Sequence, residues 1–390
     1  MNVDALVGNF NYPTAYRIGL GRIRELANAC AELDIKRPLV VTDPGILELD
    51  WFAPIVPALE AAGLATRVFS AIEANPATTH IEAGLVVAAE HQADGCLLIG
   101  GGSAMDAGKC IALLAHNPGS VLDYEDVGDN WKRADADKIL RSIAVPTTAG
   151  TGSEVGRAAV IVDPEQHNKK IIFHPQMQPD LVIADPELTL GLPPRLTAAT
   201  GMDAFAHCFE AYCAPAYHPM ADGIALEGMR LIAENLVRAF ENGRDEIART
   251  HLLMASAMGA TAFQKGLGLI HALSHPVGGM TGLHHGTANA IFQPYVMVHN
   301  RSVIEARMPR LAQALGLSGH RFEDVLDWTI RLRSRLGLPH TLEGIVDESM
   351  ISQLVPMAAE DPSLATNPKP CSHSEIERVL RKSLHGDLEP

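Results

Sequence analysis

The sequence predicts an α/β N-terminal domain with a parallel, doubly wound sheet, followed by an all-α C-terminal domain. Two observations support this prediction. Short apolar runs alternate with helical stretches through the first half of the chain, which is the pattern of βαβ units. The second half shows long helical periodicity and little strand signal. The Pro and Gly residues of DPELTLGLPP (185–194) punctuate the change, so the expected domains are residues 1–188 and 189–390.

The α/β domain is expected to open with three strands separated by helices. These strands are PLVVTD (38–43), ATRVFSAI (65–72) and GCLLIG (95–100). A helix is predicted from about 45 to 62, and Gly63 can end it. A second helix is predicted near 78–92, with Thr78 or Thr79 as its N-cap.

The rest of this domain is expected to add one helix and four extended runs. The helix starts within GGSAMDAGK and reaches about His116. The extended runs are SIAVP (142–146), AAVIVD (158–163), KKIIFH (169–174) and DLVIADP (180–186). Strands that alternate with helices in this way build a parallel sheet with helices on both faces.

Composition and charge exclude several classes of protein. Of 390 residues, 47% are hydrophobic, so a sizeable core is available. The formal net charge is −15 and the basic residues form no run, which argues against a nucleic-acid partner. No basic, apolar leader is present, and no run approaches the roughly 18 apolar residues of a membrane span. The six cysteines include no CxxC pair, so we expect reduced thiols in a cytoplasmic protein with no membrane partner.

A glycine-rich turn, IGGGSAMDAGK (99–109), follows the third strand and opens a helix. This arrangement points backbone N–H groups and the positive end of the helix dipole at an anion, so a phosphate is a candidate ligand. Neither standard fingerprint fits. Ser103 and Cys110 break the Walker A pattern, and Met105 stands where the Rossmann motif needs its third glycine. A tight turn without a ligand is the alternative, and the residues alone leave both interpretations open.

Two further features lie at predicted strand ends. PTTAGTGSEVG (146–156) offers small hydroxyl side chains and permissive backbone, which suit the phosphates and ribose of a dinucleotide. Its third glycine, Gly156, comes one place too late for the Rossmann motif. Asp43 closes the first strand, where a carboxylate can accept hydrogen bonds from a ribose 2′-OH. A plain TDPG turn is the alternative for Asp43.

The helical half contains a carboxylate and an imidazole one turn apart. Asp203 and His207, in GMDAFAHCFEAY (201–212), share one helix face at about 6 Å. Such a pair is usually a salt bridge or a helix-start carboxylate near a core histidine. By itself the pair therefore does not indicate a metal.

Four histidines, at positions 271, 275, 284 and 285, fall within HALSHPVGGMTGLHHG (271–286). The first two share a helix face, and Pro276 is expected to break their helix. Ala272 excludes the zincin motif because it replaces the general-base Glu. So much imidazole in an apolar neighbourhood is costly unless the histidines have partners. A divalent metal and a set of core or loop histidines both remain open as explanations.

Four segments resemble, in order and spacing, the iron-containing (group III) alcohol dehydrogenases. These segments are GGGSAMDAGK, PTTAGTGSE, DPELTLGLPPRLTAATGMDAFAHCFEAY and GLGLIHALSHPVGG…HHGTANAI. The resemblance covers the chain from about residue 10 to the C-terminal NPKP segment, in which Lys369 replaces the Arg common in the family. The family shares its fold with glycerol dehydrogenases and dehydroquinate synthases.

The resemblance implies a metal centre with a neighbouring catalytic histidine. The implied ligands of the divalent cation are Asp203, His207, His271 and His285. His275 matches a family histidine that lies beside the active site without binding the metal, and it is a candidate for proton transfer. Fe²⁺ is the metal that the family name favours, and Zn²⁺ is the alternative because it binds N/O sites more tightly.

The resemblance also implies an NAD site in the α/β half. The residues implied to hold the pyrophosphate are Gly101, Gly102, Ser103 and Asp106. Those implied to line the nicotinamide side are Thr147, Thr148, Thr151 and Ser153. Lys169 would reach the ribose, and Asp43 matches an acidic position associated with NAD in preference to NADP.

The implied function is a metal-dependent, NAD-linked alcohol dehydrogenase that interconverts a small primary alcohol or diol and its aldehyde, as a homodimer or larger homo-oligomer. Alternatives within the fold are a glycerol or hydroxyacid dehydrogenase, a maleylacetate-type reductase without a metal, and a dehydroquinate synthase-type lyase. The lyase needs a basic pocket, whereas residues 255–290 contain one Lys and no Arg. A non-catalytic regulator that binds NAD or a metal is the alternative outside enzymes.

Overall fold

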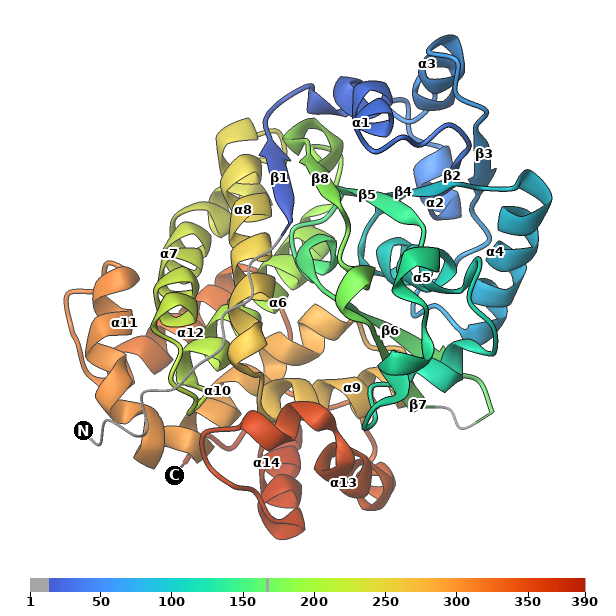
Figure 1. Cartoon of the computed structure of the whole chain (residues 1–390). Helices are drawn as coiled ribbons and strands as arrows, with labels where there is room; N and C mark the ends of the chain where they lie inside the picture. The colour runs from blue at the N-terminus through green and yellow to red at the C-terminus, as the bar shows by residue number, and fades with distance from the viewer. Residues whose placement is uncertain (1–13, 166–167, 390) are drawn as a thin grey trace. The chain divides into compact units, whose positions relative to one another are not determined.

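The computed structural model describes residues 14–165 and 168–389, shown in Figure 1. The described chain divides between Gly191 and Leu192 into two compact units. The first is an α/β unit and the second is helical.

The α/β unit is built on a six-stranded sheet in which every pairing is parallel (Figure 1). From one edge to the other, the strands are β1 (Ala15–Ile18), β8 (Leu181–Ala184), β5 (Arg141–Pro146), β4 (Gly95–Gly100), β2 (Pro38–Val41) and β3 (Arg67–Phe69). The central strand β4 is buried along its whole length, as expected when both faces of a parallel sheet are covered. The predicted parallel sheet is confirmed.

Helices cover both faces of this sheet. One apolar cluster joins Leu98 of β4 to α4 (Thr78–His91) and α5 (Gly102–Leu114). A second cluster joins Leu97 of the same strand to α1 (Leu26–Glu32) and α3 (Ile55–Ala61). Successive side chains of a strand point to opposite faces, so the apolar sequence of β4 supplies both clusters.

Three local predictions for this unit were wrong. The single helix expected over 45–62 is two helices, α2 (Pro44–Leu47) and α3, because Pro54 lacks the N–H that a continuous helix needs. The N-cap of α4 is Ala77, whose backbone N–H donates to the His80 ring, and not a threonine. The strands β6 (Ala158–Asp163) and β7 (Asn168–Phe173) form a separate antiparallel pair.

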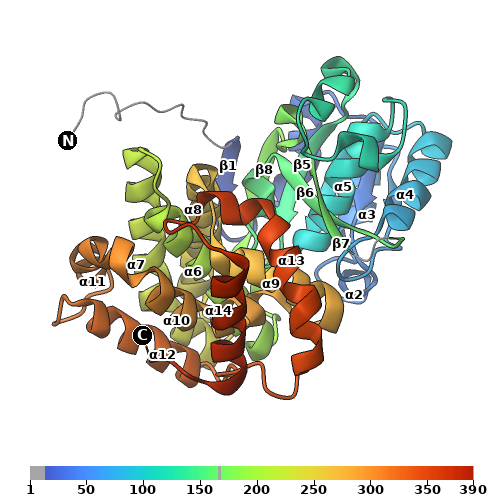
Figure 2. The ribbon, with the colours of Figure 1, turned by 90° about the horizontal axis from the view of Figure 1, so that it is seen from below.

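The helical unit packs its longest helices around α6. Its α-helices are α6 (Pro194–Cys213), α7 (Pro219–Glu241), α8 (Glu246–Ala262), α9 (Leu269–Thr281), α10 (His285–Ile304), α11 (Met308–Ala314), α12 (Phe322–Arg335), α13 (Ile351–Glu360) and α14 (His373–His385). Helix α6 packs against α7, α8 and α10, and it is buried from Thr197 to Cys213. Figure 2 shows α13 and α14 beside α9 and α10, against which they pack. Among the described helices, none is long and apolar enough to cross a bilayer.

Two prolines lie inside the helices that carry the histidines. The prediction that Pro276 breaks its helix was wrong. Helix α9 continues to Thr281, and Leu273 and Val277 on either side of the proline are fully buried. Pro294 lies inside α10 and cannot donate to the Ala290 carbonyl. The buried Arg333 guanidinium lies 3.4 Å from that carbonyl oxygen and 3.1 Å from the next one along the helix. Its charge is therefore stabilised by two backbone oxygens, one of which Pro294 deprives of its helical donor.

Candidate metal centre and cofactor turns

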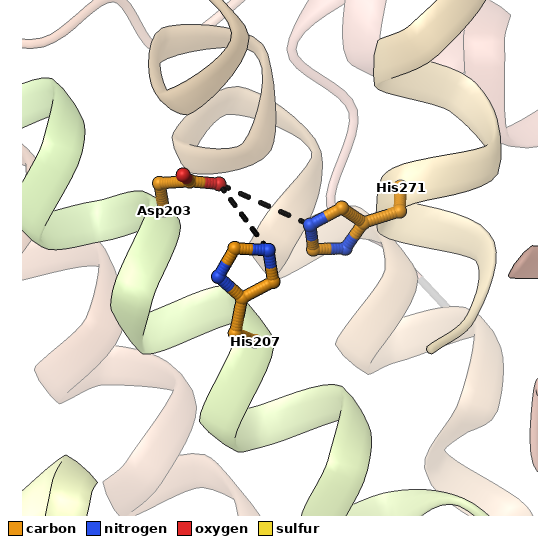
Figure 3. Close-up of side chains that lie close together, drawn as sticks. All are labelled: Asp203, His207 and His271. Atoms are coloured by element: carbon orange, nitrogen blue, oxygen red, sulfur yellow. Dashed lines mark ion pairs between the residues drawn. The ribbon is translucent and has the colours of Figure 1, made fainter. Parts of the chain in front are cut away.

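Three buried side chains of the helical unit bring their ligand atoms together (Figure 3). Asp203 and His207 lie one turn apart on α6, and His271 lies on α9. The Oδ1 atom of Asp203 is 3.8 Å from His207 Nε2 and 3.9 Å from His271 Nε2. Bonds of about 2.0–2.2 Å to one shared cation leave ligand atoms roughly 3–4 Å apart. The three side chains therefore have the spacing and the chemistry of divalent-metal ligands.

The fourth predicted ligand, His285, begins α10. Its Nε2 atom is 3.5 Å from Asp203 Oδ1, and its ring lies 5.2 Å from the His271 ring. The following residue explains how α10 comes so close to α6. A Cβ atom on Gly286 would lie 2.0 Å from the Ala199 carbonyl oxygen, so only glycine lets the two backbones approach. The four predicted ligands are thus brought together around one carboxylate oxygen.

A buried carboxylate, Glu210, fixes the ring of His271. One Glu210 oxygen lies 2.6 Å from His271 Nδ1, and the other accepts the Ile270 backbone N–H at 2.7 Å. Since a carboxylate only accepts, Nδ1 carries the proton and Nε2 faces the cluster with its lone pair. Burial lowers the pKa of His271, but the charges of Glu210 and then Asp203 outweigh it and raise that pKa. A cation at this site therefore competes with a proton.

Asn289, one turn beyond His285 on α10, is fully buried against the same group. Its Nδ2 atom lies within hydrogen-bond distance of three of the predicted ligand atoms. Neither Asn289 nor Glu210 was predicted from the sequence. Both were accessible from spacing, since Glu210 continues the Asp203–His207 face and Asn289 that of His285.

His275 lies one turn beyond His271 and is oriented by Asp361. Its Nδ1 atom is 2.7 Å from Asp361 Oδ2, and its ring stacks on His285 with centroids 5.2 Å apart. Burial raises the pKa of Asp361, but His275 and hydrogen bonds from Ser363 outweigh it and lower that pKa. The remaining histidine of the motif, His284, is exposed before α10.

In the α/β unit, the two glycine-rich turns meet at the carboxyl ends of neighbouring strands. They follow β4 and β5, which pair directly, and the Thr147 backbone N–H donates to the Gly100 carbonyl at 3.1 Å. A Cβ atom on Gly101 would lie 3.2 Å from Thr148 Oγ1, and one on Gly102 would lie 2.8 Å from a Thr151 methyl carbon. The absence of a Cβ at Gly102, and to a smaller degree at Gly101, therefore lets one turn pack on the other, whatever the turns bind. Helix α5 begins at Gly102, with Ser103 in its first turn.

Two of the predicted cofactor residues, Asp106 and Ser153, are hydrogen-bonded to each other. Asp106 Oδ1 accepts the Ser153 hydroxyl at 2.5 Å, and its Oδ2 accepts the Val160 N–H at 2.9 Å. The buried Lys109 ammonium lies 3.3 Å from Asp106. Asp106 and Ser153 thus join α5 to the second turn and to β6, a role that the sequence pattern did not indicate.

The remaining predicted cofactor residues lie at the edges of this region. Asp43 caps α2 by accepting the Ile46 N–H at 3.2 Å, so the carboxylate does take part in the local turn. A Cβ on Gly100 would lie 3.6 Å from Asp43 Oδ2, so the carboxylate is also close to the first glycine-rich turn. Lys169 lies on β7 opposite Val162.

Comparison with known proteins shows what the whole chain is similar to. A family model described as iron-containing alcohol dehydrogenase matches residues 13–186, and one for the C-terminal part of the Fe-containing alcohol dehydrogenase family matches 197–384. A 4-hydroxybutyrate dehydrogenase from Cupriavidus necator is 40% identical over 384 residues, covering 96% of this chain and 99% of the relative. The NAD-dependent methanol dehydrogenase of Bacillus methanolicus is 34% identical, covering 96% of this chain and 100% of the relative.

Solved structures agree over almost the full length. A 1,3-propanediol oxidoreductase superposes with a TM-score of 0.90 at 31% identity, covering 97% of this chain and 100% of the other. A sulfoacetaldehyde reductase from Bifidobacterium kashiwanohense, in complex with NAD⁺, has a TM-score of 0.88 at 27% identity, covering 98% and 100%. These likenesses confirm the predicted fold class.

Proposed function

The chain belongs to the iron-containing alcohol dehydrogenase family, and on this premise we propose that it is a metal-dependent, NAD-linked dehydrogenase of small primary alcohols or diols. The family and the dehydrogenases among its relatives make it an enzyme of the oxidoreductase class. The observation that supports the finer proposal is the convergence of three imidazoles on Oδ1 of the Asp203 carboxylate.

We assign the cation to Asp203, His207, His271 and His285, with Fe²⁺ as the expected metal and Zn²⁺ as the alternative. When bound, a divalent cation polarises the oxygen of the alcohol, and NAD accepts the hydride from its carbon.

We assign proton transfer to His275. With Nδ1 held by Asp361, its Nε2 is the atom that takes the alcohol proton towards solvent, and imidazole is the side chain that most often transfers protons in catalysis. The contact with Asp361 keeps the ring in one orientation, so the proton always passes through the same atom.

We assign NAD to the two turns and their surroundings, where backbone N–H groups at the start of α5 suit a pyrophosphate. Asp43 supports NAD over NADP because a carboxylate accepts from a ribose 2′-OH and repels a 2′-phosphate. We further expect a cytoplasmic homodimer or larger homo-oligomer; the six cysteines are all free thiols, as a reducing compartment would keep them.

A hydroxy acid is the second candidate substrate, because the 40%-identical relative is a 4-hydroxybutyrate dehydrogenase. The test is metal analysis of anaerobically purified protein, combined with NADH formation from primary alcohols, diols and 4-hydroxybutyrate. We expect about one divalent cation per chain and turnover of at least one of these substrates. Bound metal and NAD without turnover of any of them would favour the non-catalytic regulator instead.

A further inference from the structure

The side chain of Asn289 lies against the proposed metal ligands Asp203, His271 and His285. Its Nδ2 atom lies 2.8 Å from Asp203 Oδ1, 3.2 Å from His285 Nε2 and 3.3 Å from His271 Nε2. The residue is fully buried. One amide nitrogen thus lies among three of the four proposed ligand atoms.

The orientation of this amide is fixed by its neighbours. Asp203 only accepts hydrogen bonds when ionised, so the nitrogen and not the oxygen of Asn289 must face it. On the other side, Asn289 Oδ1 accepts the Ser274 hydroxyl at 2.5 Å. Ser274 is itself fully buried on α9, next to the ligand-bearing turn of His271. The Ser274 hydroxyl and the Asp203 carboxylate together leave one allowed arrangement.

We propose that Asn289 is a positioning residue, which holds the ligand atoms together before the cation binds and keeps Asp203 oriented afterwards. This inference rests on the metal centre of the proposed function. An amide nitrogen has two hydrogens, and three possible acceptors lie within reach of this one. Once the two imidazole lone pairs face a cation they no longer accept, and the amide keeps its bond to Asp203, whose oxygens have lone pairs to spare.

The same helix offers a matched control. Gln293 lies one turn beyond Asn289 on α10 and is equally buried. Neither amide atom of Gln293 has a hydrogen-bond partner among the described residues. If α10 needed a buried amide only for packing, substitution of either residue would weaken cobalt binding. The proposal expects this loss for Asn289 alone.

The test compares Asn289→Leu, which keeps the branched shape of the side chain, with Gln293→Met. Cobalt(II) is titrated into metal-stripped full-length protein against a chromophoric chelator, and the ligand-field spectrum of the bound ion is recorded. Changes around metal ligands typically cost about 10- to 100-fold in affinity, so we expect a loss of that size and an altered spectrum for Asn289→Leu. Gln293→Met should bind cobalt as the wild type does.

Wild-type affinity and spectrum in Asn289→Leu would overturn the inference, and so would an equal loss in Gln293→Met. Failure of the metal centre itself is distinguishable, because the wild type would then bind cobalt no more tightly than His271→Ala. If Asn289→Leu does not fold, Ser274→Ala decides. It removes the hydroxyl that Asn289 Oδ1 accepts, which also lies 3.2 Å from the His271 backbone carbonyl oxygen, and it leaves the four ligand side chains in place. Weaker cobalt binding supports the proposal and unchanged binding overturns it.

Discussion

The proposed metal site of the helical unit and the glycine-rich turns of the α/β unit are built from different parts of the chain. In the metal site that we propose, the ligand atoms belong to side chains, and three imidazoles surround Oδ1 of the Asp203 carboxylate. In the turns, which we propose to bind NAD, the absence of side chains shapes the loops, since Gly101 and Gly102 leave the space that the threonines of the second turn fill. Unusual residue types identify the first kind of site, whereas the second kind depends on which loops the fold brings together.

The largest expected effect is on the side-chain site. His271→Ala should abolish both tight metal binding and turnover, because it removes a ligand, while NAD binding and the circular dichroism of the fold remain. The loss should exceed the roughly 10- to 100-fold typical of residues around the ligands. His251→Ala, an exposed histidine on α8, is the matched control and should keep full activity. Metal content and turnover that survive in His271→Ala would remove the cluster from the mechanism.

Glu210→Gln sharpens the comparison by changing only the support of a ligand. The variant keeps size and one acceptor but removes the charge that holds the Nδ1 proton of His271. We expect about 10- to 100-fold weaker cobalt affinity, with an unchanged dissociation constant for NAD. Glu234→Gln, more than half exposed on α7, is the control. Cobalt binding as tight as in the wild type would mean that His271 needs no such partner.

The α/β unit contains a buried carboxylate, Glu154, whose pKa is raised, whereas the pKa of Asp361 in the helical unit is lowered. Burial raises the pKa of Glu154 to about 7 from its usual 4.5, and its Oε1 has no hydrogen-bond partner within the described chain. The folded state therefore holds this proton more tightly than the unfolded state. The protonated Glu154 side chain therefore contributes fully to the stability of the folded state below about pH 4.5, and this contribution is lost as the pH rises through 7.

Glu154→Gln should then stabilise the protein only at high pH. The difference between 4.5 and about 7 corresponds to roughly 3 kcal/mol at most. Thermal unfolding of protein free of metal and NAD should show a higher Tm for the variant at pH 8 and little difference near pH 4.5. An equal effect at both pH values would indicate a change in packing and not in ionisation.

The residue pattern determined how much of the fold and of the candidate site could be predicted from the sequence. Strands β2 and β4 were predictable because continuous apolar runs suit a sheet buried on both faces. Strand β1 was not predicted because it is short, partly exposed and carries Arg17. Pro276 was expected to break α9 because the cost of a helix proline is local and visible, whereas the burial that outweighs it is tertiary. The ligand set came from a family resemblance carried by rare histidines. Glu210 and Asn289 lie at helical spacing from the proposed ligands, but Glu and Asn are common residue types and the spacing alone did not single them out.

The turns respond to a smaller and more local change. Gly102→Ala would put a methyl group 2.8 Å from the Thr151 methyl carbon, and such overpacking costs about 1–3 kcal/mol. We expect weaker NAD binding by titration calorimetry, with cobalt affinity unchanged, since the ligands belong to the other unit. Adding Thr151→Ser removes the clashing methyl group but keeps the hydroxyl, so the double variant should recover part of the affinity. Gly191→Ala, with no atom within 4 Å of the added methyl group, should behave as wild type. If Gly102→Ala binds NAD normally, these turns pack on each other for the sake of the fold alone, and the cofactor must be sought elsewhere in the α/β unit.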